Sequence, residues 1–170
     1  MNHFKIREAT AADVPVLLTL IRELAAYEKL TRKVVVTESR LRKWFFGARP
    51  VAEAILGYLH GEAVAYAAFY PTFSTFSGQP GFYLEDLFVQ PDYRGRGYGQ
   101  AMLRHVARIA QKKGFTTISW SVLHWNQPAI RFYRHLGAKP APKNWLVYTL
   151  DADALSHLAQ DADKMQAEGA

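Results

Sequence analysis

Hydrophobic and polar positions follow two different periods along this chain, and together they predict a mixed succession of strands and helices. Apolar residues spaced by three and four, as between Val14 and Leu24, are typical of one face of a helix. Short β-branched and aromatic runs bounded by Gly, Pro or Asn are typical of strands. The expected strands are 4–8, 52–59, 63–70, 82–89, 116–123 and 145–150, and the expected helices run from Thr10 to Tyr27, from Thr37 to Gly47, from the loop 93–99 to Gly114, and from Asn126 to Gly137.

The segments between these elements complete the prediction of the fold. Residues 72–81 are rich in Ser, Thr, Gly and Pro, so we expect a loop there. The acidic segment after residue 150 is expected to form a helix that frays, and no internal repeat or linker interrupts the order. Because strands and helices alternate, the sequence predicts one layered α/β domain with helices on both faces of a sheet.

Length and composition narrow the class of protein. A chain of 170 residues, 49% hydrophobic and 21% charged, has room for one domain with a proper core. It contains no cysteine, which excludes disulfides, thiolate nucleophiles and cysteine zinc sites. Its six histidines never form a close metal-binding spacing, so no metal is expected. No secretory signal and no long apolar run is visible, so the expected location is the cytoplasm, without a membrane partner.

Charge is distributed unevenly along the chain. The net charge is +6, but the five acids and one lysine after residue 150 give that segment −4, so residues 1–150 carry +10. The body of the protein should therefore attract anions. Nucleic acid, anionic lipid and a phosphorylated cofactor all fit this sign.

A glycine-rich segment stands where a predicted strand gives way to a predicted helix. It reads Tyr93-Arg94-Gly95-Arg96-Gly97-Tyr98-Gly99. Such a junction aims backbone N–H groups and the positive end of the helix at one point, which suits a phosphate. Gln100 stands where a dinucleotide fingerprint needs a third glycine, and the lysine of a P-loop is absent. A solvated glycine turn is the alternative interpretation of this segment.

Several blocks in a fixed order carry a resemblance to a known family. Arg94-x-x-Gly97-x-Gly99 is preceded by Tyr83-Leu84-Glu85-Asp86-Leu87-Phe88-Val89 and followed by the block 126–138. Together with Leu24-Ala25-Ala26-Tyr27-Glu28, they make the sequence resemble the GNAT N-acetyltransferase superfamily, and within it the diamine branch that acts on spermidine, spermine or thialysine. The resemblance implies one N-acetyltransferase domain over 1–170 with its core at 4–150 and an acidic tail at 151–170. It also implies a mostly antiparallel sheet, and a homodimer whose subunits share the substrate pocket.

The resemblance also implies where acetyl-CoA binds. Amides of the glycine loop would hold its pyrophosphate, and the free edge of the strand ending at Val89 would pair with its pantetheine amides and supply the oxyanion donor. A bulge near this point would leave such backbone groups unpaired. Asn126 would hydrogen-bond the pantetheine arm, and an N-cap role is compatible with that contact. The expected acetyl-CoA contacts are Leu87, Phe88, Val89, Arg94, Gly95, Arg96, Gly97, Tyr98, Gly99, Gln100, Asn126, Gln127, Pro128 and Ala129.

Two residues are candidates for proton transfer. A primary amine with a pKa of ~10.4 needs a proton acceptor at neutral pH. Glu85 lies in an otherwise apolar strand, where burial would raise its pKa, and the resemblance places the substrate-side glutamate there; a salt-bridged structural carboxylate is the alternative. Tyr133 follows Asn126 by seven residues, where the resembling enzymes have the general acid for the departing thiolate. Its spacing also fits a core aromatic on the helix.

The expected acceptor is a small molecule with a primary amine, acetylated by direct transfer in a ternary complex. Tyr27, Glu28 and Asp86 match positions that face the amine in this branch, and carboxylates suit a positively charged substrate. The segment 73–78 lacks the further acid and the tryptophan of polyamine-acetylating relatives, so a thialysine-like amine is preferred to a polyamine. A protein or peptide N-acetyltransferase is the alternative. A nucleic-acid-binding module is a remote one, and no nucleic acid partner is expected.

Overall fold

The computed structural model of this chain describes residues 4–141 and 146–159. The chain divides into two compact units, 1–123 and 124–170. The first unit contains every strand that the structure describes, and the second contains helix α4 (Gln127–His135). No helix among the described residues is long and apolar enough to cross a bilayer.

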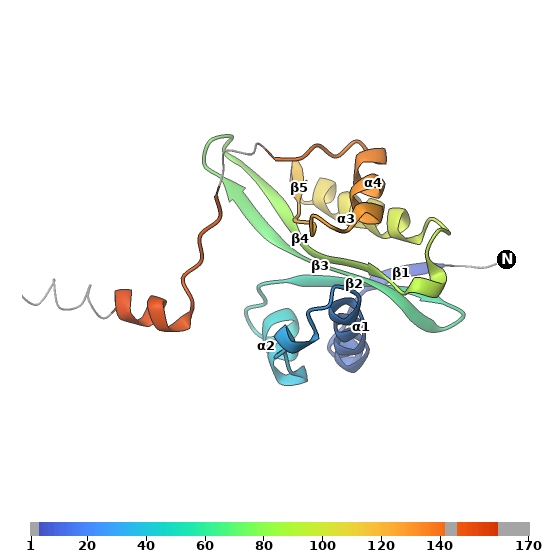
Figure 1. The fold of residues 1–170 in the computed structure, drawn as a ribbon, viewed down its shortest axis with the longest axis horizontal. Coiled ribbons are helices and arrows are strands. Elements are labelled where there is room, and N and C mark those ends of the chain that lie inside the picture. Colours follow the sequence, from blue (N-terminus) through green and yellow to red (C-terminus); the bar gives the residue numbers. More distant parts are fainter. Residues whose placement is uncertain (1–3, 142–145, 160–170) are drawn as a thin grey trace, which may run out of the picture. The chain divides into compact units, whose positions relative to one another are not determined.

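A five-stranded sheet in the order β1-β2-β3-β4-β5 forms the centre of the first unit (Figure 1). Neighbouring strands from β1 to β4 are antiparallel, and only β5 joins in parallel, so the expected mostly antiparallel sheet is confirmed. The strands are β1 (Lys5–Glu8), β2 (Glu53–Leu59), β3 (Glu62–Ser74), β4 (Gln79–Val89) and β5 (Thr117–Ser119).

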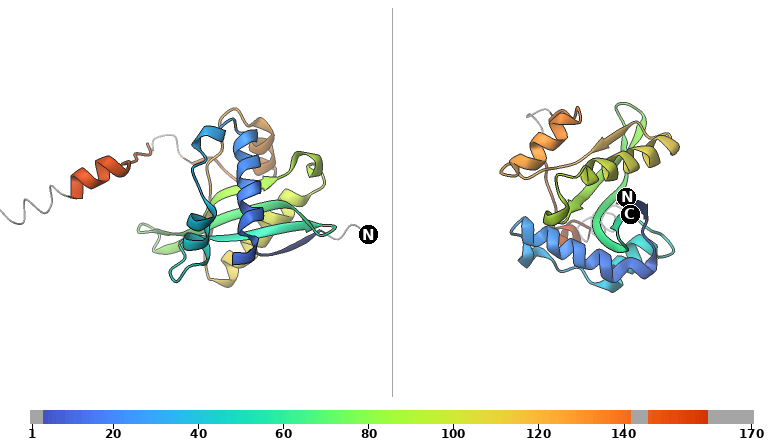
Figure 2. Two further views of the ribbon diagram at one scale, coloured as in Figure 1. Left: turned by 90° about the horizontal axis from the view of Figure 1, so that it is seen from below. Right: turned by 90° about the vertical axis from the view of Figure 1, so that its right-hand side faces the viewer.

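Helices cover both faces of this sheet, as the alternating side chains of β3 require (Figures 1 and 2). Tyr66 and Ala68 face α1 (Val14–Tyr27), which buries Leu17 and Leu20 against them. The alternate residues Ala65, Ala67 and Phe69 face α3 (Tyr98–Lys112) on the other side. Helix α2 (Glu38–Phe46) packs beside α1. This arrangement confirms the predicted layered α/β fold.

The β3–β4 hairpin extends further than the sequence predicts. The expected loop 72–81 is wrong, because Thr72 pairs with Gly81 and Ser74 pairs with Gln79. An antiparallel ladder can continue beyond the core wherever both strands supply backbone groups, and Thr72 and Phe73 are residue types that favour strands. Only residues 75–78 form the turn.

Two predicted strands are shorter than expected or absent. The strand expected over 116–123 contains only Thr117–Ser119, because pairing with β4 ends at Tyr83. The strand expected over 145–150 is also wrong: residues 146–150 form no strand and Val147 is 94% exposed, whereas Trp145 lies outside the described residues. A strand needs a neighbouring strand for its backbone groups, which an apolar pattern alone does not supply. The predicted tail helix is present over 152–159.

An ionic network fixes the start of α1 to the sheet. Asp13, which is 8% exposed, accepts two hydrogen bonds of 2.7 Å from the Arg7 guanidinium of β1. The backbone N–H and hydroxyl of Thr10 donate to the same carboxylate, as does the Tyr58 hydroxyl. The hydrogen bonds from Arg7 hold the pKa of Asp13 well below its usual range.

Asp13→Asn is expected to lower the free energy of unfolding by about 2 kcal/mol at pH 7, since it removes hydrogen bonds to a charged group. Because the folded-state pKa is depressed, this contribution is complete above the ordinary aspartate value of ~3.9 and is lost as the pH falls below it. Urea denaturation at pH 7 and at lower pH measures both effects. The exposed Glu62→Gln serves as a control, and equal stability of Asp13→Asn and wild type at pH 7 would contradict the prediction.

Candidate active site

The glycine loop before α3 leaves a cluster of backbone donors open. Gly95 and Gly97 have φ of +74° and +81°, a region that other residues rarely adopt. A Cβ built on either glycine would meet no atom within 4 Å. The first intrahelical bond of α3 runs from the Ala101 amide to the Gly97 carbonyl, so the preceding amides have no acceptor within the helix. The loop therefore offers an anion a set of N–H groups that neighbouring atoms do not obstruct at the two glycines.

The Arg94 side chain ties this loop to the rest of the first unit. Its guanidinium lies 4.1 Å from the centroid of the Tyr27 ring at the end of α1 and 5.7 Å from that of Phe88. Its Nε also donates a 2.9 Å hydrogen bond to the Val89 carbonyl at the end of β4. Stacking and hydrogen bonding thus place Tyr27, an expected substrate contact, beside the loop expected to hold acetyl-CoA.

Strand β4 has an open edge over its last residues. Its pairing with β5 ends at Tyr83, and no other described strand follows on that side. The Gln90 amide donates to the Val64 carbonyl of β3, and successive residues direct their backbone groups to opposite sides. Leu87 and Val89 therefore direct theirs to the open edge. The backbone of Phe88, expected as a third donor, is directed toward β3 instead.

A β-bulge in β4 places two acids on one face of the sheet. Ala68 pairs with Asp86 but Phe69 pairs with Leu84, so Glu85 has no partner of its own on β3. In a regular strand, Leu84 and Asp86 would face the same side. The extra residue leaves Leu84 in the core under α3 and turns Asp86 to the face that α1 covers, opposite Ala68.

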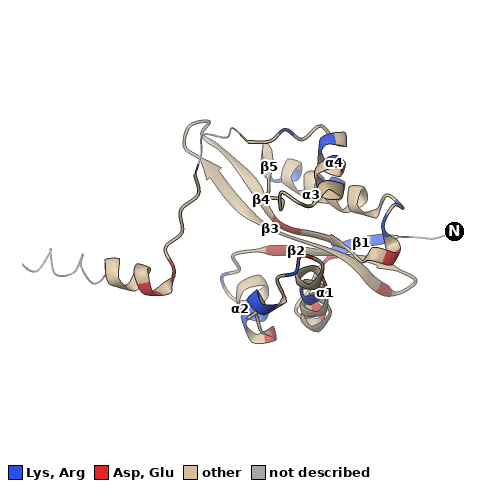
Figure 3. Ribbon diagram, in the orientation of Figure 1, with Lys and Arg blue, Asp and Glu red and all other residues tan. Residues whose placement is uncertain are grey.

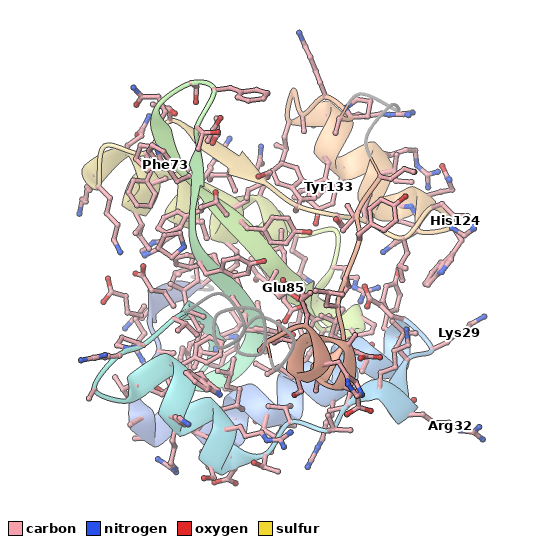
Figure 4. The ribbon with its side chains drawn as sticks, turned by 90° about the vertical axis from the view of Figure 1, so that its left-hand side faces the viewer. Lys29, Arg32, Phe73, Glu85, His124 and Tyr133 are labelled. Carbon is pink, nitrogen blue, oxygen red and sulfur yellow. The ribbon has the colours of Figure 1, made fainter. Side chains whose placement is uncertain are left out.

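The two acids differ in environment. Glu85 is exposed in the middle of the sheet (Figure 4), so the burial expected for this side chain from the sequence is not found. Burial instead raises the pKa of Asp86 to about 6; the Tyr66 hydroxyl opposes this rise, and the charges of Glu85 and Glu28 add to it. Burial also raises the pKa of Glu28, which directly follows α1.

Two tyrosines of β3, Tyr66 and Tyr70, interact with these acids. The sequence analysis identified neither of them as a site residue. Tyr66 is fully buried, and its hydroxyl makes no hydrogen bond of ordinary geometry among the described residues, although it interacts with Asp86. The pKa of Tyr70 is raised by partial burial and by the Glu85 carboxylate. A phenol within an apolar strand is the one sequence signal that could have indicated them. We call Glu28, Tyr66, Glu85 and Asp86 the acidic site.

The second unit holds the remaining expected residues. Asn126 caps α4, since its side-chain oxygen accepts a 3.3 Å hydrogen bond from the Ala129 amide, which confirms its N-cap role. Gln127 and Pro128 form the first turn, and the Gln127 side chain donates to the His124 carbonyl at 2.8 Å. Tyr133 lies about two turns after Asn126, on the same side of the helix. It is half-buried, with its ring 5.2 Å from that of Phe132.

No group of three or more His, Asp or Glu side chains in the described part of the chain could hold a metal ion. The charged residues are distributed unevenly over the ribbon, with acidic residues in the middle of β4 and basic residues on α2 and on the loop before α3 (Figure 3). An acidic site beside a basic, donor-rich loop suits a cationic substrate and an anionic cosubstrate.

Comparison with known proteins identifies the family that uses this arrangement. The sequence profile of the acetyltransferase (GNAT) family matches residues 20–138. The chain belongs to the GNAT family. It is 37% identical to the thialysine N-epsilon-acetyltransferase of Bos taurus, over 94% of this chain and 99% of that one. It is 30% identical to the L-ornithine N5-acetyltransferase of Arabidopsis thaliana, over 89% and 86% of the two chains.

The fold of this GNAT enzyme also occurs in solved structures of low sequence identity. An integron cassette protein of V. cholerae superposes with a TM-score of 0.75 at 22% identity, over 92% of this chain and 97% of that one. The protein is thus an N-acetyltransferase by family and by its relatives. The expected site residues and the single domain over 1–170 stay predictions, although the family match crosses from the first unit into the second.

Proposed function

We propose that this enzyme transfers the acetyl group of acetyl-CoA to the side-chain amine of a small amino acid resembling thialysine. The observation that carries the proposal is the acidic site, where Glu28, Glu85 and Asp86 gather at the bulge of β4. Arg94 links the end of α1, beside Glu28, to the glycine loop. A site for a cationic amine therefore adjoins a site for a phosphorylated cosubstrate.

The residues of the glycine loop fit acetyl-CoA. The space that a Cβ of Gly95 or Gly97 would fill is open, so a pyrophosphate can approach the amides of residues 95–100 closely. Leu87 and Val89 direct backbone N–H groups to the open edge, where they can bind pantetheine and stabilise an oxyanion. Asn126 is proposed to bind the pantetheine arm from the start of α4. Acetyl-CoA itself supplies the acetyl group as a thioester.

Proton transfer then requires two side chains. A carboxylate of the acidic site accepts a proton from the substrate ammonium, which frees the nitrogen lone pair for attack. Tyr133 donates its hydroxyl proton to the departing thiolate, since a phenol with a pKa of ~10 matches that basicity. Since the chain has no cysteine, direct transfer in a ternary complex is simpler than an acyl-enzyme route.

The charges next to the acidic site favour an amino acid over a polyamine. Lys29 directly follows Glu28, and Arg32 and Lys33 stand shortly after it; all three are exposed and have no carboxylate partner among the described residues. Lys29 and Arg32 point outward from this segment (Figure 4). These cations repel a second ammonium group but attract a carboxylate. Thialysine and L-ornithine, named for the relatives above, both carry such a carboxylate beside their α-amine.

We therefore expect kcat/KM for thialysine to exceed that for spermidine by at least about 10-fold, which corresponds to ~1.4 kcal/mol of transition-state binding. Initial rates of coenzyme A release with each amine at pH 7.5 measure this ratio. 1,5-Diaminopentane is the control, because it has two amines and no carboxylate. It separates the effect of the positive charge from the effect of the substrate carboxylate. Efficient turnover of spermidine with poor turnover of thialysine would contradict the substrate class, and turnover of peptides alone would favour a protein N-acetyltransferase.

Two further expectations belong to the same proposal. We propose a homodimer in which both subunits contribute to the substrate pocket, which sedimentation at micromolar concentration would test. The cytoplasmic location expected from the sequence stays a prediction.

A further inference from the structure

We propose that Phe4 is a positioning residue for acetyl-CoA, because its ring holds the first turn of α3 in place at the end of the glycine loop. Phe4 directly precedes β1, and its ring stacks on that of Tyr98, with centroids 4.2 Å apart and planes inclined by 12°. The inference rests on the proposed function, which assigns the pyrophosphate to the amides of residues 95–100. Phe4 acts through Tyr98 and not by its own contact with the cosubstrate.

A glycine in β2 provides the space in which the Phe4 ring lies. Gly57 is buried, and a Cβ built on it would collide with the ring of Phe4 and would lie 3.0 Å from the sulfur of Met102. Met102 is fully buried and stands one helical turn after Tyr98, so both residues belong to the same face of α3. Phe4 also packs against the core cluster to which Met102 belongs. The ring therefore fills the gap between β2 and the first turn of α3.

The glycine loop needs an anchor at each end, because glycine has more backbone freedom than any other residue. Arg94 anchors the start through its hydrogen bond to the Val89 carbonyl and its stacking on Tyr27. The stack of Phe4 on Tyr98 anchors the other end, where the amides of α3 are not yet bonded within the helix. Holding these donors in place before binding reduces the conformational entropy that acetyl-CoA must remove.

Phe4→Ala and Phe115→Ala form a matched pair for the test. Phe115 is also half-buried, packs on the same core cluster and has its ring 4.8 Å from that of Phe82, but it follows the far end of α3. Both variants should melt below wild type to a similar extent. In calorimetry, only Phe4→Ala should bind acetyl-CoA more weakly, by about 10-fold, which is the upper end for one aromatic pair. Unchanged affinity in Phe4→Ala, or an equal loss in Phe115→Ala, would overturn the inference.

Phe4→Leu keeps the inference testable if removal of the whole side chain unfolds the protein. Leucine retains apolar packing over Gly57 but cannot stack on Tyr98, so we expect a melting temperature close to that of wild type together with a loss of affinity. Wild-type affinity in this variant would contradict the role of the stack.

Kinetics separate positioning from a loss of stability. Phe4→Leu should raise KM for acetyl-CoA and leave both kcat and KM for the amine unchanged, because the stack contributes to binding alone. A smaller folded fraction would lower kcat and leave KM unchanged, and that result would reduce Phe4 to a structural residue.

Gly57→Ala tests the same contact from the opposite side. Its methyl group should displace the Phe4 ring and weaken acetyl-CoA binding in an otherwise wild-type chain. In Phe4→Ala the ring is absent, so adding Gly57→Ala should cause no further loss of affinity. Losses that add in the double variant would mean that the two substitutions act independently, which would overturn the route through the Phe4 ring.

Hydrogen exchange monitors the first turn of α3 without any cosubstrate. The Ala101 amide donates to the Gly97 carbonyl at 3.0 Å, and this bond should open more often in Phe4→Leu than in wild type or Phe115→Ala. Equal protection of the Ala101 amide in all three proteins would contradict the inference. If wild type binds no acetyl-CoA, the proposed function fails, and the exchange of this amide still decides whether Phe4 holds the first turn.

Discussion

Gly97→Val is expected to weaken acetyl-CoA binding by about 100-fold or more while the chain stays folded. Gly97 has φ +81° and is the N-cap residue of α3, and the space beside its Cα is open. A valine side chain would occupy the space proposed for the pyrophosphate and displace the neighbouring amides. Losing two charge-assisted hydrogen bonds at ~1.5 kcal/mol each gives ~3 kcal/mol, and each ~1.4 kcal/mol is tenfold in affinity. Calorimetry with acetyl-CoA measures the loss, and circular dichroism monitors the fold.

A matched control stands at the other end of the same helix. Gly114 has φ +73°, and a Cβ there also meets no atom within 4 Å. Gly114→Val therefore introduces similar backbone strain, about 1–2 kcal/mol, without approaching the glycine loop. We expect comparable melting temperatures for the two variants but normal affinity in Gly114→Val. If both bind acetyl-CoA alike, the affinity loss reflects strain alone or the loop is not the binding site.

The strand and helix pattern predicted the layers of the fold because each element has a local signature. The stripe from Val14 to Leu24 is α1, and the glycines that follow α3 and α4 adopt the positive φ expected of helix ends. The 146–150 segment shows the limit of this reasoning, since a run of aliphatic, aromatic and β-branched residues forms a strand only where another strand accepts its hydrogen bonds. The local sequence of a segment does not determine whether another strand will pair with it.

The candidate site shows the same division. The position of the glycine loop between β4 and α3 could be predicted from the sequence, because the glycines stand where the strand pattern gives way to the helix pattern. The environment of Glu85 could not be predicted in this way. Regular alternation would place Leu84 and Asp86 on the same face of the sheet, whereas the bulge at Glu85 places them on opposite faces. Two consecutive acids between Leu84 and Leu87 break the period of two, and this is the only trace of the bulge in the sequence.

Tyr133→Phe is expected to lower kcat by about 100-fold with little change in KM for acetyl-CoA, because a general acid acts only in the transition state. The structure gives this tyrosine a defined place: α4 is capped by the Asn126 side chain, and Tyr133 follows about two turns later on the same side. A residue that binds pantetheine and a residue that protonates the thiolate would then act along one side of one helix. The substitution removes only the hydroxyl, so the packing of its ring on Phe132 is retained.

Steady-state rates between pH 7 and 9 measure the effect, with Tyr148→Phe as the matched control. Tyr148 is 86% exposed, and loss of its hydroxyl should change neither kcat nor stability. If kcat of Tyr133→Phe is normal across this range, Tyr133 is a packing residue of α4, and the thiolate leaves without a protein proton donor or takes its proton from water.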